Sequence, residues 1–313
     1  MGEEGEDEGG PKKVGLKELL GISVSITAAC IGIITNLISI AYFLRRKNKN
    51  LGDKYLILLN TLDITICILA TFVNTVALKC GEYACGLFPF LENFHVDSST
   101  MFETVVELSS LATCFLCALR AISISRPLYQ ISRTKVYLSS ALAVIYIIAA
   151  KSIISHLKTL GIVGKKDGES HVSSTMKLSL VNTGIMVVFV MICLIVSVRG
   201  LKKTRPERSE QGVDTNEKAT KMILILGVLF LTFNSVWMAT MTFFMVLDVG
   251  TSGGPGEDAE KDMAAVQTVT YFAMSVNSAT NPIVYMTRNE EMNKHIKKLF
   301  NRVKITFCRM QNP

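Results

Sequence analysis

Four ionisable side chains stand inside long apolar segments of this chain, and they are the residues best placed to do chemistry. They are Asp63, Glu103, Glu107 and Lys151. A charged group in a lipid-like environment is costly, so it usually faces the interior of a helix bundle together with a partner. If these segments are helices, Glu107 and Lys151 rise to a similar depth, about 20 Å from one end. The sequence therefore predicts a buried ion pair between Glu107 and Lys151.

Glu103 leaves more than one interpretation open. It could serve a structural role beside Lys151, or it could bind a ligand.

The patterns of common enzyme sites are missing from the sequence. It contains no H-E-x-x-H zinc motif, no nucleophile elbow and no phosphate-binding loop. Cys114 and Cys117 have C-x-x-C spacing, but they lie in an apolar segment and are best interpreted as packing residues. We therefore expect no enzymatic activity and no organic cofactor.

The elements that position these groups are long apolar blocks. The chain has 313 residues, of which 49% are hydrophobic. A helix of roughly 20 apolar residues crosses the core of a bilayer, and its backbone satisfies its own hydrogen bonds there. The sequence predicts an all-α membrane protein, a seven-transmembrane helix bundle. We place the spans near residues 16–44, 54–79, 97–124, 135–157, 174–199, 219–247 and 264–287.

The basic residues predict the orientation. Most of the 33 Lys and Arg residues fall in one set of connections and in the C-terminal part. The positive-inside rule places that set in the cytoplasm, so the N-terminus is expected outside. We therefore attribute the net charge of +7 to the segments expected in the cytoplasm, and we expect no nucleic-acid partner. We divide the chain into a disordered extracellular tail (1–15), the seven-transmembrane domain (16–287), an amphipathic membrane-surface helix (288–303) and a cytoplasmic tail (304–313).

Several motifs on these segments resemble the motifs of a known protein family. The last span contains N-S-x-x-N-P-x-x-Y, from Asn277 to Tyr285. The first span has Thr35-Asn36, the second has L-x-x-x-D from Leu59 to Asp63, and the third ends in a stretch from Leu119 to Leu128 that aligns Arg120 with an E/D-R-Y arginine. In these motifs the chain resembles the rhodopsin-like (class A) G protein-coupled receptors, over all seven spans.

The resemblance implies a receptor in the plasma membrane, embedded in the lipid bilayer. It would pass the signal of an extracellular small molecule or peptide to a heterotrimeric G protein. A seven-helix transporter or a non-signalling scaffold is the alternative. The resemblance also implies a set of switch residues facing the G protein: Arg120, Asn281, Pro282 and Tyr285. A polar pocket, with or without Na⁺, would combine Asn36, Asp63, Ser109, Asn277 and Asn281. A ligand pocket would use Phe102, Glu103 and Trp237.

The chain also departs from the family pattern. Leu119 stands where an acid normally restrains the arginine, so we expect a freer Arg120 and raised basal activity. Cys80 and Cys85 precede the third span, but residues 158–176 contain no cysteine for the family's disulfide. Either that clamp is absent or Cys80 pairs locally with Cys85, which an extracellular location permits. The spacing from Cys85 to Arg120 would also fit an insertion near residues 100–109.

Overall fold

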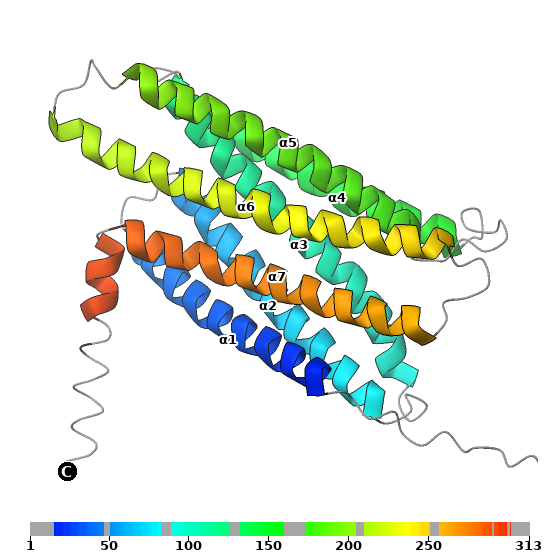
Figure 1. Cartoon of the computed structure of the whole chain (residues 1–313). Helices are drawn as coiled ribbons and strands as arrows, with labels where there is room; N and C mark the ends of the chain where they lie inside the picture. The colour runs from blue at the N-terminus through cyan, green and yellow to red at the C-terminus, as the bar shows by residue number, and fades with distance from the viewer. Residues whose placement is uncertain are drawn as a thin grey trace, which may run out of the picture.

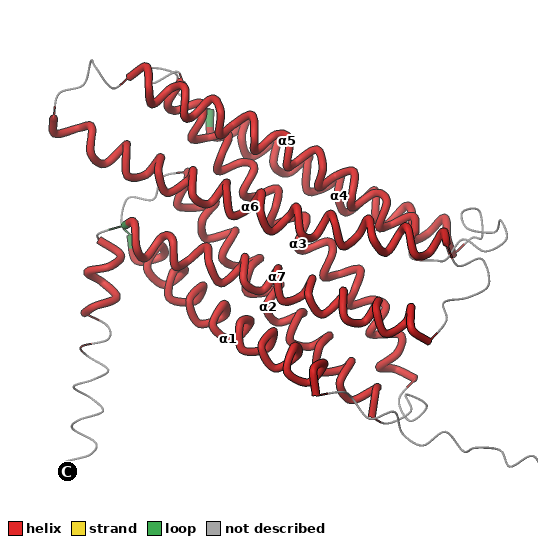
Figure 2. Tube along the Cα trace, in the orientation of Figure 1, coloured by secondary structure: helices red, strands yellow, loops and turns green. Residues whose placement is uncertain are grey.

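A computed structural model of the chain describes residues 16–46, 51–82, 89–125, 132–159, 173–204, 210–250, 257–289, 291–298 and 301. Side chains are described over narrower ranges within the helices. The predicted tails, 1–15 and 304–313, lie outside this part. Within it, all regular structure is helical, as Figure 2 shows. The long helices are α1 (Leu16–Arg45), α2 (Leu51–Glu82), α3 (Pro89–Ser125), α4 (Arg133–Thr159), α5 (Ser173–Thr204), α6 (Glu210–Gly250) and α7 (Glu257–Arg288).

Six of these helices are long and apolar enough to cross a membrane, namely α1 to α6. Over its described residues α7 is not among them. Its second half carries a run of polar side chains, including Ser275, Asn277 and Asn281, which lowers its hydropathy. The prediction of an all-helical membrane protein is confirmed for the described residues. Composition marks six of the helices as candidate spans, so the seventh span stays a prediction.

The helices pack into one bundle with α3 at its centre. In Figure 1 the helices lie roughly alongside one another, and α3 contacts α2, α4, α5 and α6. Helices α1 and α7 complete the bundle by packing against each other, and α7 also packs against α2 and α6. α4 lies at the periphery, against α3 and α5. This arrangement brings side chains from α2, α3 and α7 into one interior.

The outer faces of the bundle are apolar. Large side chains on different helices are mostly exposed, among them Ile34 at 59%, Leu142 at 58% and Ile185 at 64%. A soluble protein rarely shows apolar surface this extensive. The inner faces hold two buried apolar clusters, one around Leu59 and Tyr285 and one around Trp237. The chain is thus a multi-pass helical membrane protein, with lipid as the solvent of its outer surface.

A short helical segment follows α7 and spans residues 291–298. It turns steeply away from the axis of α7 (Figure 1). Asn289 caps its start, because the backbone N–H of Met292 donates to Asn289 Oδ1 at 3.2 Å. Met292 is fully buried and Ile296 packs against the same apolar cluster, which fixes the segment to the bundle. The segment lies within the predicted helix 288–303, whose first residue, Arg288, is the last residue of α7.

Candidate functional site

The centre of the site is Asp63, a fully buried carboxylate on α2. Ser109 of α3 donates to Asp63 Oδ1 at 2.9 Å, and Ser278 of α7 approaches the same oxygen at 3.4 Å. Asn281 of α7 donates to the other oxygen, Oδ2, at 2.8 Å. Three hydrogen-bond donors from two neighbouring helices therefore surround one acid, which offsets part of the cost of burying it.

A proline connects this cluster to α1. Pro282 lies inside α7 and has no N–H, so the carbonyl of Ser278, four residues earlier, loses its helical hydrogen bond. Asn36 of α1 takes that place, because its Nδ2 donates to Ser278 O at 3.0 Å and to Gly32 O at 2.8 Å. Asn36 therefore reaches Asp63 only through Ser278. A motif residue of α1 thus satisfies the backbone carbonyl that the motif proline of α7 leaves free.

The remaining residues of the expected polar pocket and switch lie nearby without joining the cluster. Asn277 is half-buried and makes no hydrogen bond to Asp63 among the described residues. Tyr285 is completely buried, and its ring packs edge-on against Phe43 of α1 at 6.1 Å between centroids. Its hydroxyl has no hydrogen-bond partner in the described part of the chain. Tyr285 therefore contributes packing between α1 and α7.

Arg120 connects the third helix to the sixth. Its Nε donates to Thr220 Oγ1 of α6 at 2.8 Å, and Thr220 is buried. The absence of an acid at Leu119 led us to expect a freer Arg120, and this part of the expectation was wrong. A hydroxyl of the facing helix holds the guanidinium instead. This hydrogen bond joins α3 to α6, whereas an acid at position 119 would lie on α3 together with Arg120.

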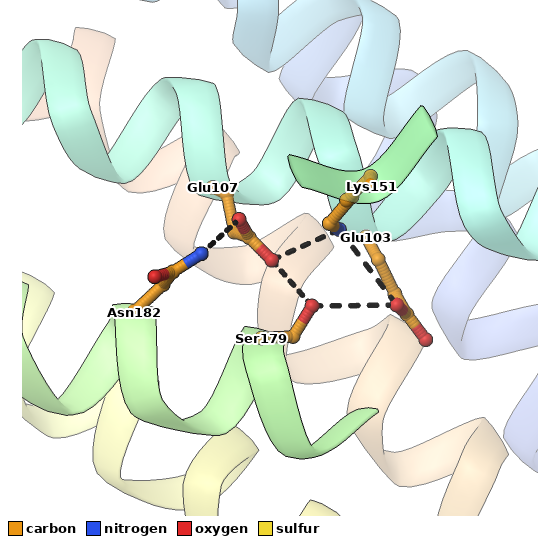
Figure 3. A network of polar contacts seen from close by, with 5 residues as sticks. All are labelled: Glu103, Glu107, Lys151, Ser179 and Asn182. Carbon is orange, nitrogen blue, oxygen red and sulfur yellow. Dashed lines mark hydrogen bonds and ion pairs between the residues drawn. The ribbon is translucent and has the colours of Figure 1, made fainter. Parts of the chain in front are cut away.

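A second polar network joins α3, α4 and α5, and Figure 3 shows its five residues. Lys151 Nζ of α4 lies 2.9 Å from Glu107 Oε1 and 3.8 Å from Glu103 Oε2, both on α3. All three side chains are at most 9% exposed. The expected pair Glu107–Lys151 is present, and Glu103 belongs to the same group.

Helix α5 completes this network with two polar side chains. Ser179 donates to Glu107 and also lies 3.4 Å from Glu103 Oε2, while Asn182 Nδ2 donates to Glu107 Oε2 at 3.2 Å. A hydroxyl has only one hydrogen, so Ser179 can donate to one carboxyl group at a time. The network holds three helices together through charge-assisted contacts, two carboxyl groups sharing one ammonium group.

The three residues expected to form a ligand pocket divide into two places. Phe102 packs edge-on against Tyr271 of α7, with ring centroids 4.7 Å apart. It shares a buried apolar cluster with Trp237 of α6, which is completely buried. Glu103 turns instead toward Lys151 and Ser179. The described side chains thus place Phe102 and Trp237 in the core and Glu103 in the charged network.

The structure describes only some of the cysteines for which the sequence made predictions. Cys85 and the side chain of Cys80 lie outside the described residues, so the expected local disulfide falls there too. Cys114 and Cys117 are free and buried in the larger apolar cluster, as packing residues. Within the described residues, no group of three or more His, Cys, Asp or Glu side chains could hold a metal ion.

Sequence reasoning missed four partners, all of them neutral: Thr220, Ser278, Ser179 and Asn182. Two signals could have found some of them. Ser278 stands four residues before Pro282, where a free carbonyl must occur. Ser179 and Asn182 are three residues apart in an apolar segment, which places them on one face of a helix.

The chain was compared with protein-family models and with curated proteins. No protein-family model matches the chain, and no curated protein matches it.

Proposed function

We propose that this chain is a receptor of the rhodopsin-like class, which passes an extracellular signal to a heterotrimeric G protein. The observation that supports this most directly is the convergence on Asp63 of Ser109 and Asn281, from α3 and α7. Asp63 and Asn281 belong to the motifs that carry the resemblance, and Ser109 belongs to the polar pocket that the resemblance implies. The proposal includes a seventh membrane crossing by α7 and an N-terminus outside the plasma membrane.

The signal would be transmitted by a shift between two arrangements of the bundle. Arg120 and Thr220 connect α3 and α6 near the end of the bundle where α3 finishes, which we assign to the cytoplasm. Moving α6 away from α3 requires breaking this hydrogen bond. A ligand that binds the separated arrangement more tightly shifts the equilibrium by its difference in affinity. Breaking the contact would free Arg120 to meet the G protein.

We infer the chemical class of the ligand from two groups of side chains that lie toward the other end of the bundle from Arg120. The charged network of Glu103, Glu107 and Lys151 occupies the α3–α4–α5 side, and the aromatic cluster of Phe102 and Trp237 occupies the α6–α7 side. A small molecule or peptide with both an apolar part and a polar group would complement these two groups of side chains, which are buried and would have to separate to admit it. Agonist binding would act by rearranging one group relative to the other.

A sodium ion fits the chemistry at Asp63. Ser109 and Ser278 bring two hydroxyl oxygens to the same carboxylate oxygen, and hard cations take oxygen ligands. Asp63, Ser109 and Ser278 would hold the ion, which would supply a positive charge beside a buried carboxylate. The three hydrogen bonds already present keep these side chains oriented for that role.

Guanine-nucleotide exchange tests the proposal. Membranes containing the full chain are mixed with purified G proteins of each subtype, and nucleotide exchange is measured with and without candidate ligands. We expect exchange above that of empty membranes and its loss in Arg120→Ala. Lys54→Ala removes an exposed cation at the same end of the bundle and serves as the matched control. Exchange equal to empty membranes for every subtype would contradict the proposal.

A further inference from the structure

An open pocket of about 390 Å³ lies between the end of α1 and the segment 291–298. Its walls carry four cationic side chains and one acidic side chain: Arg45 and Arg46 from α1, Lys294, Lys298 and Glu291 from the segment. Tyr42 and His295 form the aromatic part of the lining, with ring centroids 5.9 Å apart. None of these residues belongs to the proposed signalling machinery.

Two of the charged groups already have partners. Arg46 forms an ion pair with Asp53 of α2 at 3.0 Å, and Glu291 accepts a hydrogen bond from the Tyr42 hydroxyl at 3.3 Å. Among the described residues, no acidic side chain lies within ion-pair distance of Arg45, Lys294 or Lys298. Arg45, Lys294 and Lys298 carry three positive charges and Glu291 carries one negative charge. About two positive charges of the pocket are therefore not neutralised by the protein. Both lysines and Arg45 are exposed and can reach a ligand in the pocket.

The position of the pocket points to a lipid. The membrane-spanning part of α1 ends at Arg45, so the pocket lies where the hydrocarbon core gives way to the headgroups. Ile34 lies eleven residues before Arg45 on α1, about three turns, and is 59% exposed, so it shares with Arg45 an outward face that leads from the pocket along the helix. A headgroup in the pocket would leave its acyl chains on this apolar face.

We propose that this pocket binds the headgroup of an anionic phospholipid that carries a phosphomonoester. A phosphomonoester has about 1.5 to 2 negative charges at neutral pH, which matches the charge that the pocket leaves uncompensated. Arginine and lysine are the side chains that recognise phosphate, the first through paired N–H donors and the second as a point charge. A headgroup with a single net charge would neutralise only part of the site. The proposal needs the membrane location but not the receptor function.

The bound lipid would also hold the segment 291–298 in place. Met292 and Ile296 attach one face of this segment to the bundle, whereas Lys294 and Lys298 extend from another. A phosphate between Arg45 and the two lysines would join the end of α1 to the segment by charge-assisted contacts. Lipid binding therefore should stabilise the junction that follows α7.

Native mass spectrometry of the purified full chain tests this proposal. The protein is titrated with phosphatidic acid, a phosphatidylinositol phosphate and phosphatidylserine that share the same acyl chains. We expect both phosphomonoester lipids to bind more tightly than phosphatidylserine. The double variant Lys294→Gln/Lys298→Gln should weaken their binding roughly 25-fold, since each basic residue near a membrane surface contributes about a fivefold change.

Two controls separate the site from general attraction. Lys202→Gln removes an exposed lysine at the same end of the bundle, on α5, and should leave lipid binding unchanged. Equal losses in Lys202→Gln and in the double variant, or no loss in either, would overturn the proposal. Inositol trisphosphate is added as a soluble competitor. If it binds as tightly as the lipid, the assignment to a lipid is overturned and the pocket takes free phosphates.

Discussion

At the scale of single residues, charge decides which contacts matter most. Lys151 is the ammonium group that contacts two buried carboxyl groups, those of Glu103 and Glu107. A buried charge left without its partner costs far more than the intact pair contributes. The network should therefore tolerate the loss of a matched pair better than the loss of one partner.

Replacing Lys151 with methionine should destabilise the protein by about 3 kcal/mol, because it leaves two buried carboxyl groups without a cation. The double variant Lys151→Met/Glu107→Gln should recover part of that loss. Unfolding in detergent can be followed with a thiol-reactive dye, since Cys67, Cys114 and Cys117 are free and buried. A double variant less stable than Lys151→Met would contradict the assigned pairing.

Thr220 offers a test of the restraint on Arg120. Thr220→Val keeps the shape of the side chain but removes the oxygen that accepts from Arg120 Nε. A hydrogen bond to a charged group contributes about 1.5–3 kcal/mol, so basal nucleotide exchange should rise about tenfold or more. Thr232→Val is the matched control, because Thr232 bonds only to its own helix through Val228 O. Unchanged basal exchange in Thr220→Val would show that this contact does not restrain the bundle.

The possible ion at Asp63 is tested by exchanging salts. If Na⁺ binds there, replacing KCl by NaCl at equal concentration should raise the unfolding temperature, because a ligand of the folded state stabilises it. Asp63→Asn should remove the difference between the two salts. A difference of the same size in Asp63→Asn would place the sodium effect elsewhere.

Sequence reasoning worked for charged residues and failed for hydroxyl groups, for a physical reason. An acid or a lysine in an apolar helix must find a partner, so its depth along the helix was enough to pair Glu107 with Lys151. A serine or threonine can instead bond to the carbonyl four residues earlier, as Thr61 and Thr71 do here. Only the rotation of each helix decides that Ser179 faces another helix.

At the scale of elements, α7 differs from its neighbours. Its motif residues were identifiable, but its polar second half removes it from the group of strongly apolar helices. The bundle compensates by supplying partners, since Asp63 meets Ser278 and Asn281, and Asn36 takes the free carbonyl of Ser278. The partner of that carbonyl was not predictable, because it depends on how closely α1 approaches α7.

Glycine permits a close approach of α1 to α2. A β-carbon added to Gly32 of α1 would lie 2.6 Å from Cys67 Sγ of α2, whereas its distance of 3.5 Å to Ala279 Cβ of α7 would be an ordinary van der Waals contact. Small residues at helix contacts let membrane helices come together.

A double-mutant cycle tests the pairing of Asn36 with the carbonyl that Pro282 leaves free. Asn36→Leu alone should cost about 1 kcal/mol or more of stability, because Ser278 O loses its partner. In the Pro282→Ala background the helix regains an N–H for Ser278 O, so the same change should cost less. The measurement is the thiol-dye unfolding temperature of all four proteins. Additive effects would contradict the coupling.

At the scale of the whole molecule, hydropathy predicts the all-helical membrane class, and the basic residues predict an orientation that stays a prediction. Both depend on averages over many residues, so single departures such as Lys151 do not disturb them. The fold class could be predicted for this reason. The distribution of the polar groups among the helices could not, because it depends on which faces meet inside the bundle.

Epitope insertions test the seventh crossing. One tag is placed within residues 251–256, between α6 and α7, and another after residue 301. If α7 crosses the membrane, the first tag is accessible in intact cells and the second only after permeabilisation. A tag within residues 205–209, between α5 and α6, should behave like the second. Tags on either side of α7 that respond alike would show that α7 does not cross.

The peripheral position of α4 has a consequence for how the chain is assembled. Only 11% of its membrane-spanning stretch is buried, so little apolar packing attaches it to the rest, and the charged network contributes much of the attachment. A lysine at the middle of an isolated helix opposes insertion by about 2.5–3.5 kcal/mol, and Lys151, which lies near the end of the span Thr134–Ile153, opposes it by a smaller amount. During biosynthesis, α4 should therefore enter the bilayer beside an already inserted α3, whose two glutamates supply the compensating charge.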